Sequence, residues 1–417
     1  MVLWFSLSNF FSIKDTVTVS FEAEKIASAA ARDLPDNVFT AGKKQYLKTV
    51  GIFGPNASGK SSIYKALLFC TRLIVDSHTN NEGSVFNFVP FKFDGYDEQP
   101  STFTIRFVCE GTEYEYAFSL NRKEIISESL KDFSGGRGAK VFVREEKVGK
   151  PKSEIYSFGE GYFVRPLDVA HSTGRSTLFI SRASQMDRDL AKKIYRFFSG
   201  EFYVGLPLIP DEYAVELCTQ NKKLLLEALR MADSDIVDVE IRHERVTVPA
   251  LAPDPRFGIQ PVFQQKNIPR FLTRHKRNPN IQFDLLTEES QGTVQIFSLL
   301  LILLDICKNG KTLVADEFDV SLHSAMADFI INLVHASAKA QFLFTSHNTN
   351  LIDIKKFRRD QICFTNKKED GSTDFYSLYD FKDFRENMDA EKGYLQGRFD
   401  AVPYTATSVE TIKKLFE

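Results

Sequence analysis

The chain has 417 residues, of which 43% are hydrophobic and 26% charged, and its net charge is −2 at pH 7. These values are typical of a globular protein of about two or three domains, or of one domain with a large insertion, and they give no global reason to bind nucleic acid. The longest apolar run, Ile296 to Ile306, is too short to span a bilayer. The five cysteines are scattered and form no C-x-x-C pair. We therefore expect a cytoplasmic protein with reduced thiols and no membrane contact.

The N-terminal part reads as strands followed by one helix. Residues 2–22 alternate in places around a turn at Ile13 to Asp15, which predicts two strands. Residues 23–45 are polar and rich in alanine, so we expect a loop there. A strand is predicted from Tyr46 to Phe53 and a helix from Ser62 to Val75.

A glycine-rich stretch, Gly54 to Ser62, joins that strand to that helix and matches the pattern G-x(4)-G-K-[ST]. Gly54 and Gly59 let the backbone curl so that successive N–H groups cradle phosphate oxygens, and the helix start adds its positive dipole end. Lys60 would reach the β- and γ-phosphates of a bound nucleotide, and the Ser61 hydroxyl would ligate Mg²⁺. The other predicted contacts in this loop are Asn56, Ser58 and Ser62.

The middle of the chain changes from strands to helices and back. Apolar alternation predicts an antiparallel meander at residues 100–131 and further short strands at residues 140–165. The elements predicted next are helices at Met186–Phe198 and Asp211–Met231 and strands at residues 237–248 and 259–286.

The C-terminal part returns to alternating helices and strands. Its predicted elements are a helix at Gln291–Cys307, a strand at Thr312–Ala315, a helix at Ser321–Ala336, and strands at Gln341–Thr345, Gln361–Asn366 and Asp374–Leu378. Because more than 200 residues separate the glycine-rich loop from the next strand–helix–strand unit, the layout predicts an α/β nucleotide-binding core split by an inserted antiparallel β and helical lobe. The predicted parts are residues 1–80, 81–280 and 281–417.

Two strand ends of the C-terminal part carry polar side chains that suit nucleotide hydrolysis. Asp316 and Glu317 end an apolar strand; Asp316 would hold the Mg²⁺ shell through water, and Glu317 would orient and deprotonate the attacking water. Ser346 and His347 end the next strand, at the edge where parallel sheets bind ligands. The His347 imidazole could contact the γ-phosphate and sense its loss.

A fourth motif, Glu289 to Thr293, opens the long predicted helix. Ser290 and Gly292 at a helix N-terminus can form an anion site. In an ABC-type layout one subunit cannot place both this motif and its own glycine-rich loop on one γ-phosphate, so the motif would cap the nucleotide of a second subunit. The alternative is an ordinary helix N-cap followed by a glycine.

The order of these motifs resembles that of ABC-type ATPases of the RecF/SMC-like branch. The chain is also similar to the compact ATP-binding proteins of phage-defence operons, the RloA-like and AbiLi-like proteins, which are related to AriA of the PARIS system. That family usually has Arg or Lys where this chain has Phe11. The stretches that carry the resemblance are Leu7–Ser12, Pro100–Phe103, Glu289–Thr293, Asp316–His323, Thr345–Thr349, Arg358–Ile362 and Tyr394–Phe399.

The resemblance implies an ATPase that uses ATP and Mg²⁺ in a head-to-tail dimer or larger homo-oligomer. It also implies control of a partner effector in antiviral or abortive-infection defence, such as a Toprim-type nuclease encoded nearby, with a phage protein or DNA as the trigger. The main alternative is a RecF/SMC-like ATPase acting on DNA in repair or recombination, although the sequence has no long heptad coiled coil. A self-contained nuclease of the OLD type is disfavoured, because only about 70 residues follow His347, too few for a Toprim domain.

The segment Lys266 to Arg277 carries five cations and could form a nucleic-acid or partner-binding face. It lies in a predicted hairpin, where exposed positive side chains are common, and we favour that simpler interpretation.

Overall fold

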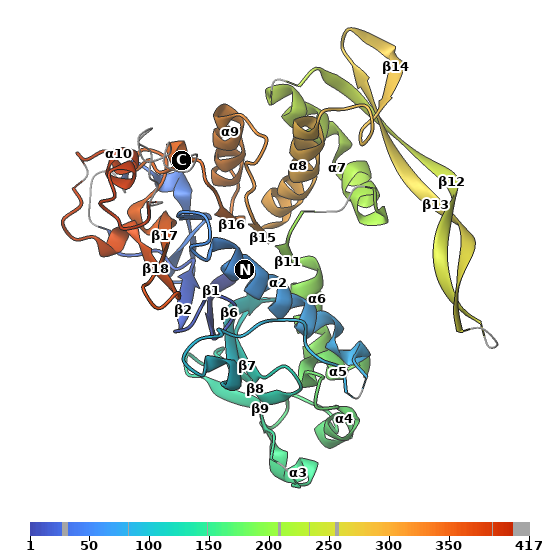
Figure 1. The fold of residues 1–417 in the computed structure, drawn as a ribbon, viewed down its shortest axis with the longest axis vertical. Coiled ribbons are helices and arrows are strands. Elements are labelled where there is room, and N and C mark those ends of the chain that lie inside the picture. The colour runs from blue at the N-terminus through green and yellow to red at the C-terminus, as the bar shows by residue number, and fades with distance from the viewer. Residues whose placement is uncertain are drawn as a thin grey trace, which may run out of the picture. The chain divides into compact units, whose positions relative to one another are not determined.

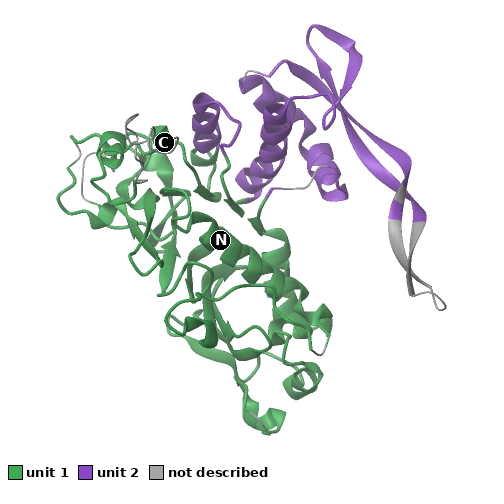
Figure 2. Ribbon diagram, viewed as in Figure 1, with its two compact units in different colours: residues 1–205, 310–318, 334–417 green, residues 206–309, 319–333 purple. Residues whose placement is uncertain are grey.

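The computed structural model describes residues 1–26, 32–81, 83–147, 149–206, 210–232, 234–254, 258–385 and 387–402. The chain divides into two compact units (Figure 2): the first comprises residues 1–205, 310–318 and 334–417, and the second comprises residues 206–309 and 319–333. The unit boundaries differ from the division at residues 80 and 280 that the sequence suggests, because residues 81–205 belong to the same compact unit as the glycine-rich loop.

Within the described residues, the first unit contains an antiparallel sheet in the order β10-β9-β8-β7-β6-β1-β2 (Figure 1). Alternate side chains of β6 are buried, which is the period that predicted the meander. The N-terminal strand pair is also confirmed, since β1 pairs with β2. The strands are β1 (Val2–Ser8), β2 (Val17–Ser20), β6 (Ser101–Cys109), β7 (Thr112–Leu120), β8 (Ile125–Asp132), β9 (Ala139–Glu145) and β10 (Tyr156–Phe158).

A second, mixed sheet of the same unit has the order β11-β15-β16-β5-β17-β18 among the described residues. All neighbours are parallel except β17 and β18. Because β5, β15 and β16 are parallel, their carboxyl ends meet at one edge of the sheet. The strands are β5 (Thr49–Phe53), β11 (Phe202–Val204), β15 (Thr312–Ala315), β16 (Gln341–Thr345), β17 (Ile362–Lys367) and β18 (Thr373–Ser377).

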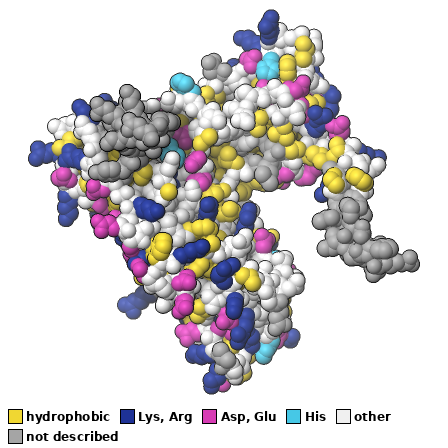
Figure 3. Space-filling model, viewed as in Figure 1, with side chains coloured by type: hydrophobic (Ala, Val, Ile, Leu, Met, Phe, Trp, Pro, Cys, Tyr) yellow, Lys and Arg dark blue, Asp and Glu magenta, His cyan; other side chains and the backbone are white. Residues whose placement is uncertain are grey.

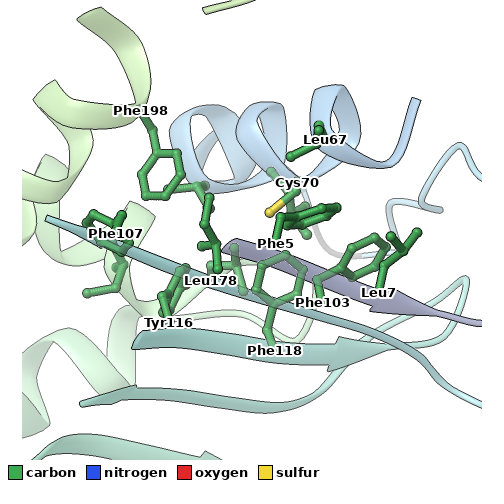
Figure 4. Close-up of a cluster of buried hydrophobic side chains, with 14 of the residues drawn as sticks. Phe5, Leu7, Leu67, Cys70, Phe103, Phe107, Tyr116, Phe118, Leu178 and Phe198 are labelled. Atoms are coloured by element: carbon green, nitrogen blue, oxygen red, sulfur yellow. The ribbon is translucent and has the colours of Figure 1, made fainter. Parts of the chain in front are cut away.

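Helix α2 (Lys60–Asp76) covers the antiparallel sheet, and its buried face joins the largest apolar core (Figure 4). The core is rich in aromatic rings, such as Phe107 and Phe197, whose centroids are 4.8 Å apart. The other helices of this unit are α3 (Lys152–Ile155), α4 (Pro166–Ser172), α5 (Phe179–Gln185), α6 (Asp189–Gly200) and α10 (Ala390–Leu395), with short 3-10 turns at Pro35–Asn37, Ser77–Thr79, Tyr96–Glu98, Thr349–Leu351, Arg359–Gln361 and Leu378–Asp380.

Two expectations for the N-terminal part are wrong. The predicted loop at residues 23–45 contains strand β3 (Val38–Ala41), which pairs with β4 (Lys44–Leu47). The predicted strand from Tyr46 to Phe53 is two strands, because the chain leaves the β3–β4 hairpin and joins the mixed sheet after Lys48. The Lys48 ammonium is buried at this point and donates to the carbonyl groups of His335 and Ser337 at 2.7 and 2.6 Å.

The second unit combines helices with a long two-stranded ribbon, β12 (Ile236–Asp254) and β13 (Gly258–His275), followed by β14 (Asn278–Asp284) (Figure 1). Its helices are α7 (Glu212–Met231), α8 (Gln291–Asn309) and most of α9 (Ser324–His335). Within the described residues, α8 alone is long and apolar enough to cross a membrane by composition, yet 61% of its apolar window is buried inside the protein, as in the core helix of a soluble domain.

Two of the five cations in the basic segment of the ribbon are paired with carboxylates. Arg270 binds Glu244 and Asp284, each at 2.8 Å, and Arg274 binds Glu240 at 3.0 Å. On the face seen in Figure 3, Lys and Arg side chains are interspersed with Asp and Glu over the first unit. Residues 266–275 lie on β13 of the β12–β13 hairpin, as predicted.

Candidate nucleotide site

The glycine-rich loop lies between β5 and α2, and its two glycines are required by its backbone. Gly54 has φ +152° and Gly59 has φ +111°, conformations that side chains disfavour. A Cβ on Gly54 would lie 2.3 Å from the Thr365 carbonyl oxygen, and a Cβ on Gly59 would lie 2.0 Å from the Thr373 hydroxyl oxygen. Glycine therefore permits both the turn and its close packing against β17 and β18.

Lys60 begins α2 and its side chain turns back over the loop. The ammonium donates to the carbonyl oxygens of Gly54 and Pro55 at 2.7 and 3.0 Å. Burial lowers the pKa of Lys60 to about 8, although Glu317 and Asp316 act in the opposite direction. The loop thus holds a partly desolvated cation that an additional negative charge would stabilise.

A chain of hydroxyl groups fixes the loop from behind, and sequence reasoning missed it. Thr373 donates to the Ser58 carbonyl at 2.9 Å, and its hydroxyl oxygen lies 2.8 Å from that of Ser12. Ser12 in turn lies 2.9 Å from the hydroxyl of Ser62, and Ser58 lies 2.6 Å from that of Thr365. The hydroxyl groups of Ser58 and Ser62, two of the predicted nucleotide contacts, are therefore hydrogen-bonded to other residues of the protein.

The carboxylates Asp316 and Glu317 follow β15 and are held by one hydroxyl group. Thr345, the last residue of β16, donates to the Asp316 carboxylate at 2.6 Å and accepts from the Glu317 backbone N–H at 2.7 Å. Glu317 has φ +47°, a conformation that costs about 1 kcal/mol or more outside glycine. Thr345 thus stabilises a strained backbone that turns the Glu317 side chain into the neighbouring cavity.

His347 lies beside Glu317. Its Nε2 atom is 3.5 Å from the Glu317 carboxylate, and both side chains remain over 40% exposed. The preceding residue, Ser346, is buried, and its hydroxyl accepts from the Asn348 N–H at 2.9 Å. Of the Ser-His pair, the histidine is therefore the accessible member.

One cavity of about 610 Å³ is lined by the loop, by Glu317 and by His347, whereas Asp316 is not among its lining residues. The polar part of its lining includes the loop from Asn56 to Ser62 together with Glu317 and His347, and the lining also contains rings and aliphatic groups. Phe11 is one of these rings, and the Lys65 ammonium lies 5.3 Å from its centroid. The apolar wall is formed by Phe11, Val89, Pro90, Phe91 and Phe93. The lining therefore offers both polar groups for phosphates and apolar surface for a base ring, the two parts of a nucleotide.

The donor set fits a magnesium ion that is shared with phosphate oxygens. Within the described chain there is no group of three or more His, Cys, Asp or Glu side chains able to hold a metal ion. Ser61 lines the cavity, and the Asp316 carboxylate keeps one oxygen outside its bond to Thr345. Magnesium retains several waters and is bound by one or two protein oxygens plus substrate phosphates, so Ser61 would bind it directly and Asp316 through water.

The remaining predicted residues, Ser290 and Gly292, lie in the second unit at the start of α8. The Ser290 hydroxyl is exposed and accepts from the Thr293 N–H at 3.1 Å, so Ser290 is an N-cap. A Cβ on Gly292 would lie 3.2 Å from the Ser321 carbonyl oxygen, which is tighter than ordinary packing. Ser290 therefore has a structural role, while its exposure leaves the helix end open to an anion.

Three features together define a P-loop nucleoside triphosphatase domain. They are the strand–loop–helix, the carboxylates at the end of the neighbouring strand, and the mixed sheet. Residues 50–353 match the protein family described as "AAA domain, putative AbiEii toxin, Type IV TA system". The chain belongs to this family. A comparison with curated proteins found no match.

Among solved structures, the chain is similar to head domains of SMC proteins. The SmcHead bound to the C-winged helix domain of ScpA is 14% identical, with a TM-score of 0.42 and coverage of 90% of this chain and 97% of that chain. The SMC head domain from Thermotoga maritima is 15% identical, with a TM-score of 0.39 and coverage of 90% and 98%. The Smc head domain with an extended coiled coil bound to the C-terminal domain of ScpA derived from Pyrococcus furiosus is 14% identical, with a TM-score of 0.37 and coverage of 90% and 96%.

Proposed function

We propose that the protein is an ABC-type ATPase that binds and hydrolyses ATP with Mg²⁺. The single observation that supports this most strongly is the cavity that unites the glycine-rich loop, Glu317 and His347. In this proposal the loop N–H groups and Lys60 hold the phosphates. Glu317 orients water and accepts its proton, and His347 contacts the γ-phosphate. When bound, Mg²⁺ neutralises the developing charge on the phosphate oxygens.

We further propose that the ATP site is completed by a second copy of the chain. Ser290 and Gly292 lie at an exposed helix start in a compact unit separate from that of the glycine-rich loop. In a head-to-tail dimer, each α8 N-terminus would meet the γ-phosphate bound by the partner subunit. The two ATP molecules would then join the two chains, and hydrolysis would separate them.

The biological role that we propose is control of a toxic effector, most simply a nuclease encoded nearby, in antiviral or abortive-infection defence. The family description names an AbiEii toxin-like domain, and the motifs resemble those of phage-defence ATPases. ATP-driven assembly would hold the effector inactive or active, and a phage protein or DNA would be the trigger. Affinity capture of the tagged chain from infected cells, with and without ATP, tests this role. Capture of a nuclease whose association with the chain depends on ATP supports this role. Capture of repair or recombination proteins with DNA would overturn it.

Nucleotide affinity is expected to depend on pH through Lys60. Before a nucleotide binds, the pKa of Lys60 is about 8, whereas phosphate charge favours the protonated form. Binding therefore takes up a proton above pH 8, and the affinity should fall by up to about tenfold for each pH unit above this value. Fluorescence titrations of labelled ATP at low protein concentration check this. Lys60→Arg, which stays charged, should give a flatter profile; equal slopes in both proteins would contradict the assignment.

A further inference from the structure

The base of the β12–β13 ribbon is joined to the turn that precedes α8, entirely within the second unit. Phe271 of β13 accepts a backbone hydrogen bond from the Leu285 N–H at 2.9 Å, and its ring meets that of Phe297 on α8 at a centroid distance of 5.7 Å. Asp284 binds Arg270 of β13 and caps the turn by accepting from the Thr287 N–H at 3.0 Å. The ribbon and the start of α8 are thus connected by several contacts.

His275, the last residue of β13, makes the connection nearest to the Ser290–Gly292 turn. Its Nε2 atom lies 2.7 Å from the carboxylate of Glu289, the residue directly before Ser290. Its Nδ1 atom lies 2.7 Å from the carboxylate of Asp235, directly before β12. The Thr273 hydroxyl donates to the same Glu289 oxygen. One imidazole therefore links both strands of the ribbon base to the residue that precedes the exposed helix start.

This geometry requires a particular protonation state. An imidazolium donates from both ring nitrogens, whereas a neutral imidazole can donate from only one and leaves the other facing a carboxylate lone pair. Burial lowers the pKa of His275, but the hydrogen bonds to Asp235 and Glu289 together raise this pKa above its usual 6.5. Both bonds are thus complete only in the protonated form.

Other charged groups also lie at this junction. Arg274, the preceding residue of β13, binds Glu240 of β12 at 3.0 Å. Glu288, beside Glu289, accepts from the Asp284 N–H at 2.6 Å. Strand β14 presents the ring of Phe283 to the imidazole, at a centroid distance of 4.9 Å, and the cations Lys276 and Arg277 follow His275 in the chain. Asp235 and Glu289 are therefore the carboxylates that respond to the imidazole proton.

We propose that His275 is a positioning residue that couples the β12–β13 ribbon to the Ser290–Gly292 turn, so that its protonation strengthens ATP-dependent association of two chains. The inference rests on the proposed function, in which this turn completes the ATP site of a second copy. A partner that displaces the ribbon would then act on the helix start through the His275–Glu289 contact. Displacement of the ribbon would thereby regulate the ATP-dependent association of two chains.

The sign of the pH effect follows from the direction of the pKa shift. Because the pKa of His275 is raised in the folded protein, the contribution of the linked imidazolium is complete below about pH 6.5 and is lost as the pH rises through the folded-state value. Association should therefore be stronger below pH 6.5 than at a pH above the folded-state pKa of His275. An effect of about fivefold or more is expected, which is the usual size of a coupling between two sites.

The test compares His275→Gln with His243→Gln on the ribbon. His243 lies on β12, where it meets the exposed Glu212 of α7 at 3.5 Å. Association is measured by analytical ultracentrifugation between pH 5.5 and 8 in the Glu317→Gln background. Saturating ATP removes the contribution of Lys60. We expect the wild-type pH response in His243→Gln and a flat, weaker association in His275→Gln, with unchanged ATP binding by the isolated chain.

The pH response itself decides the outcome. An identical response in His275→Gln and His243→Gln would overturn the inference. If His275→Gln fails to fold, Glu289→Gln provides the second variant, because it keeps the side-chain shape but removes one charge; an unchanged pH response there would also overturn the coupling. A parent chain that binds ATP but does not associate at any pH would instead refute the two-chain site of the proposed function.

Discussion

Glu317→Gln is expected to reduce ATP hydrolysis by about 10²- to 10⁴-fold, which is the usual contribution of a general base. The amide cannot accept a proton from water, but it has nearly the shape of the carboxylate. The backbone should be unaffected, because Thr345 binds the Glu317 N–H and not the side chain. ATP should therefore still bind, and chains joined by ATP should accumulate. Phosphate release and light scattering measure the two effects on the same sample.

The matched control for this substitution is Glu154→Gln. Glu154 lies on α3 of the same unit, is about half exposed and pairs with Lys150 at 2.9 Å, so a neutral amide there should alter neither hydrolysis nor particle size. Two results would contradict the proposal in different ways. Undiminished hydrolysis in Glu317→Gln would remove Glu317 from the reaction, and lost hydrolysis with an unchanged size distribution in ATP would refute the two-chain site.

The elements nearest the site were predictable because each is a short apolar run with polar ends. The predicted strands Thr312–Ala315 and Gln341–Thr345 have the same bounds as β15 and β16. Such strands are buried on both faces of a parallel sheet, so burial and sequence pattern coincide. The positions of Glu317 and His347 follow directly, since each comes just after one of these strands.

Long-range pairing explains what the sequence did not reveal. Strand β6 lies beside β1, about 100 residues earlier, so the meander belongs to the same unit as the glycine-rich loop. Thr365 and Thr373 support the loop from more than 300 residues away, and no local pattern marks a threonine for that role. The short helices α4 and α5 have seven residues each, too few for a clear helical period.

Lys60→Ala is expected to abolish measurable nucleotide binding. The ammonium is the buried cation of the loop, and hydrogen bonds to charged groups are worth about 1.5–3 kcal/mol each, so losing two of them corresponds to about 100-fold or more in affinity. Isothermal titration with ATP measures this loss, and a thermal melt verifies that the variant is folded. Lys65→Ala is the matched control, because Lys65 lies further along α2 in the same cavity but over the Phe11 ring.

Comparing the two lysine variants distinguishes the effect of the position of a lysine on nucleotide affinity from the effect of its positive charge alone. If general attraction of phosphate by positive charge were sufficient, the two alanine variants would lose affinity equally, because each removes one cation from the same cavity. If the loop holds the phosphates as proposed, Lys65→Ala should lose less than about fivefold, since its exposed charge is screened by water and salt. Retained affinity in a folded Lys60→Ala protein would refute the assignment of the glycine-rich loop. Lys60 would then be a structural residue that binds the Gly54 and Pro55 carbonyls.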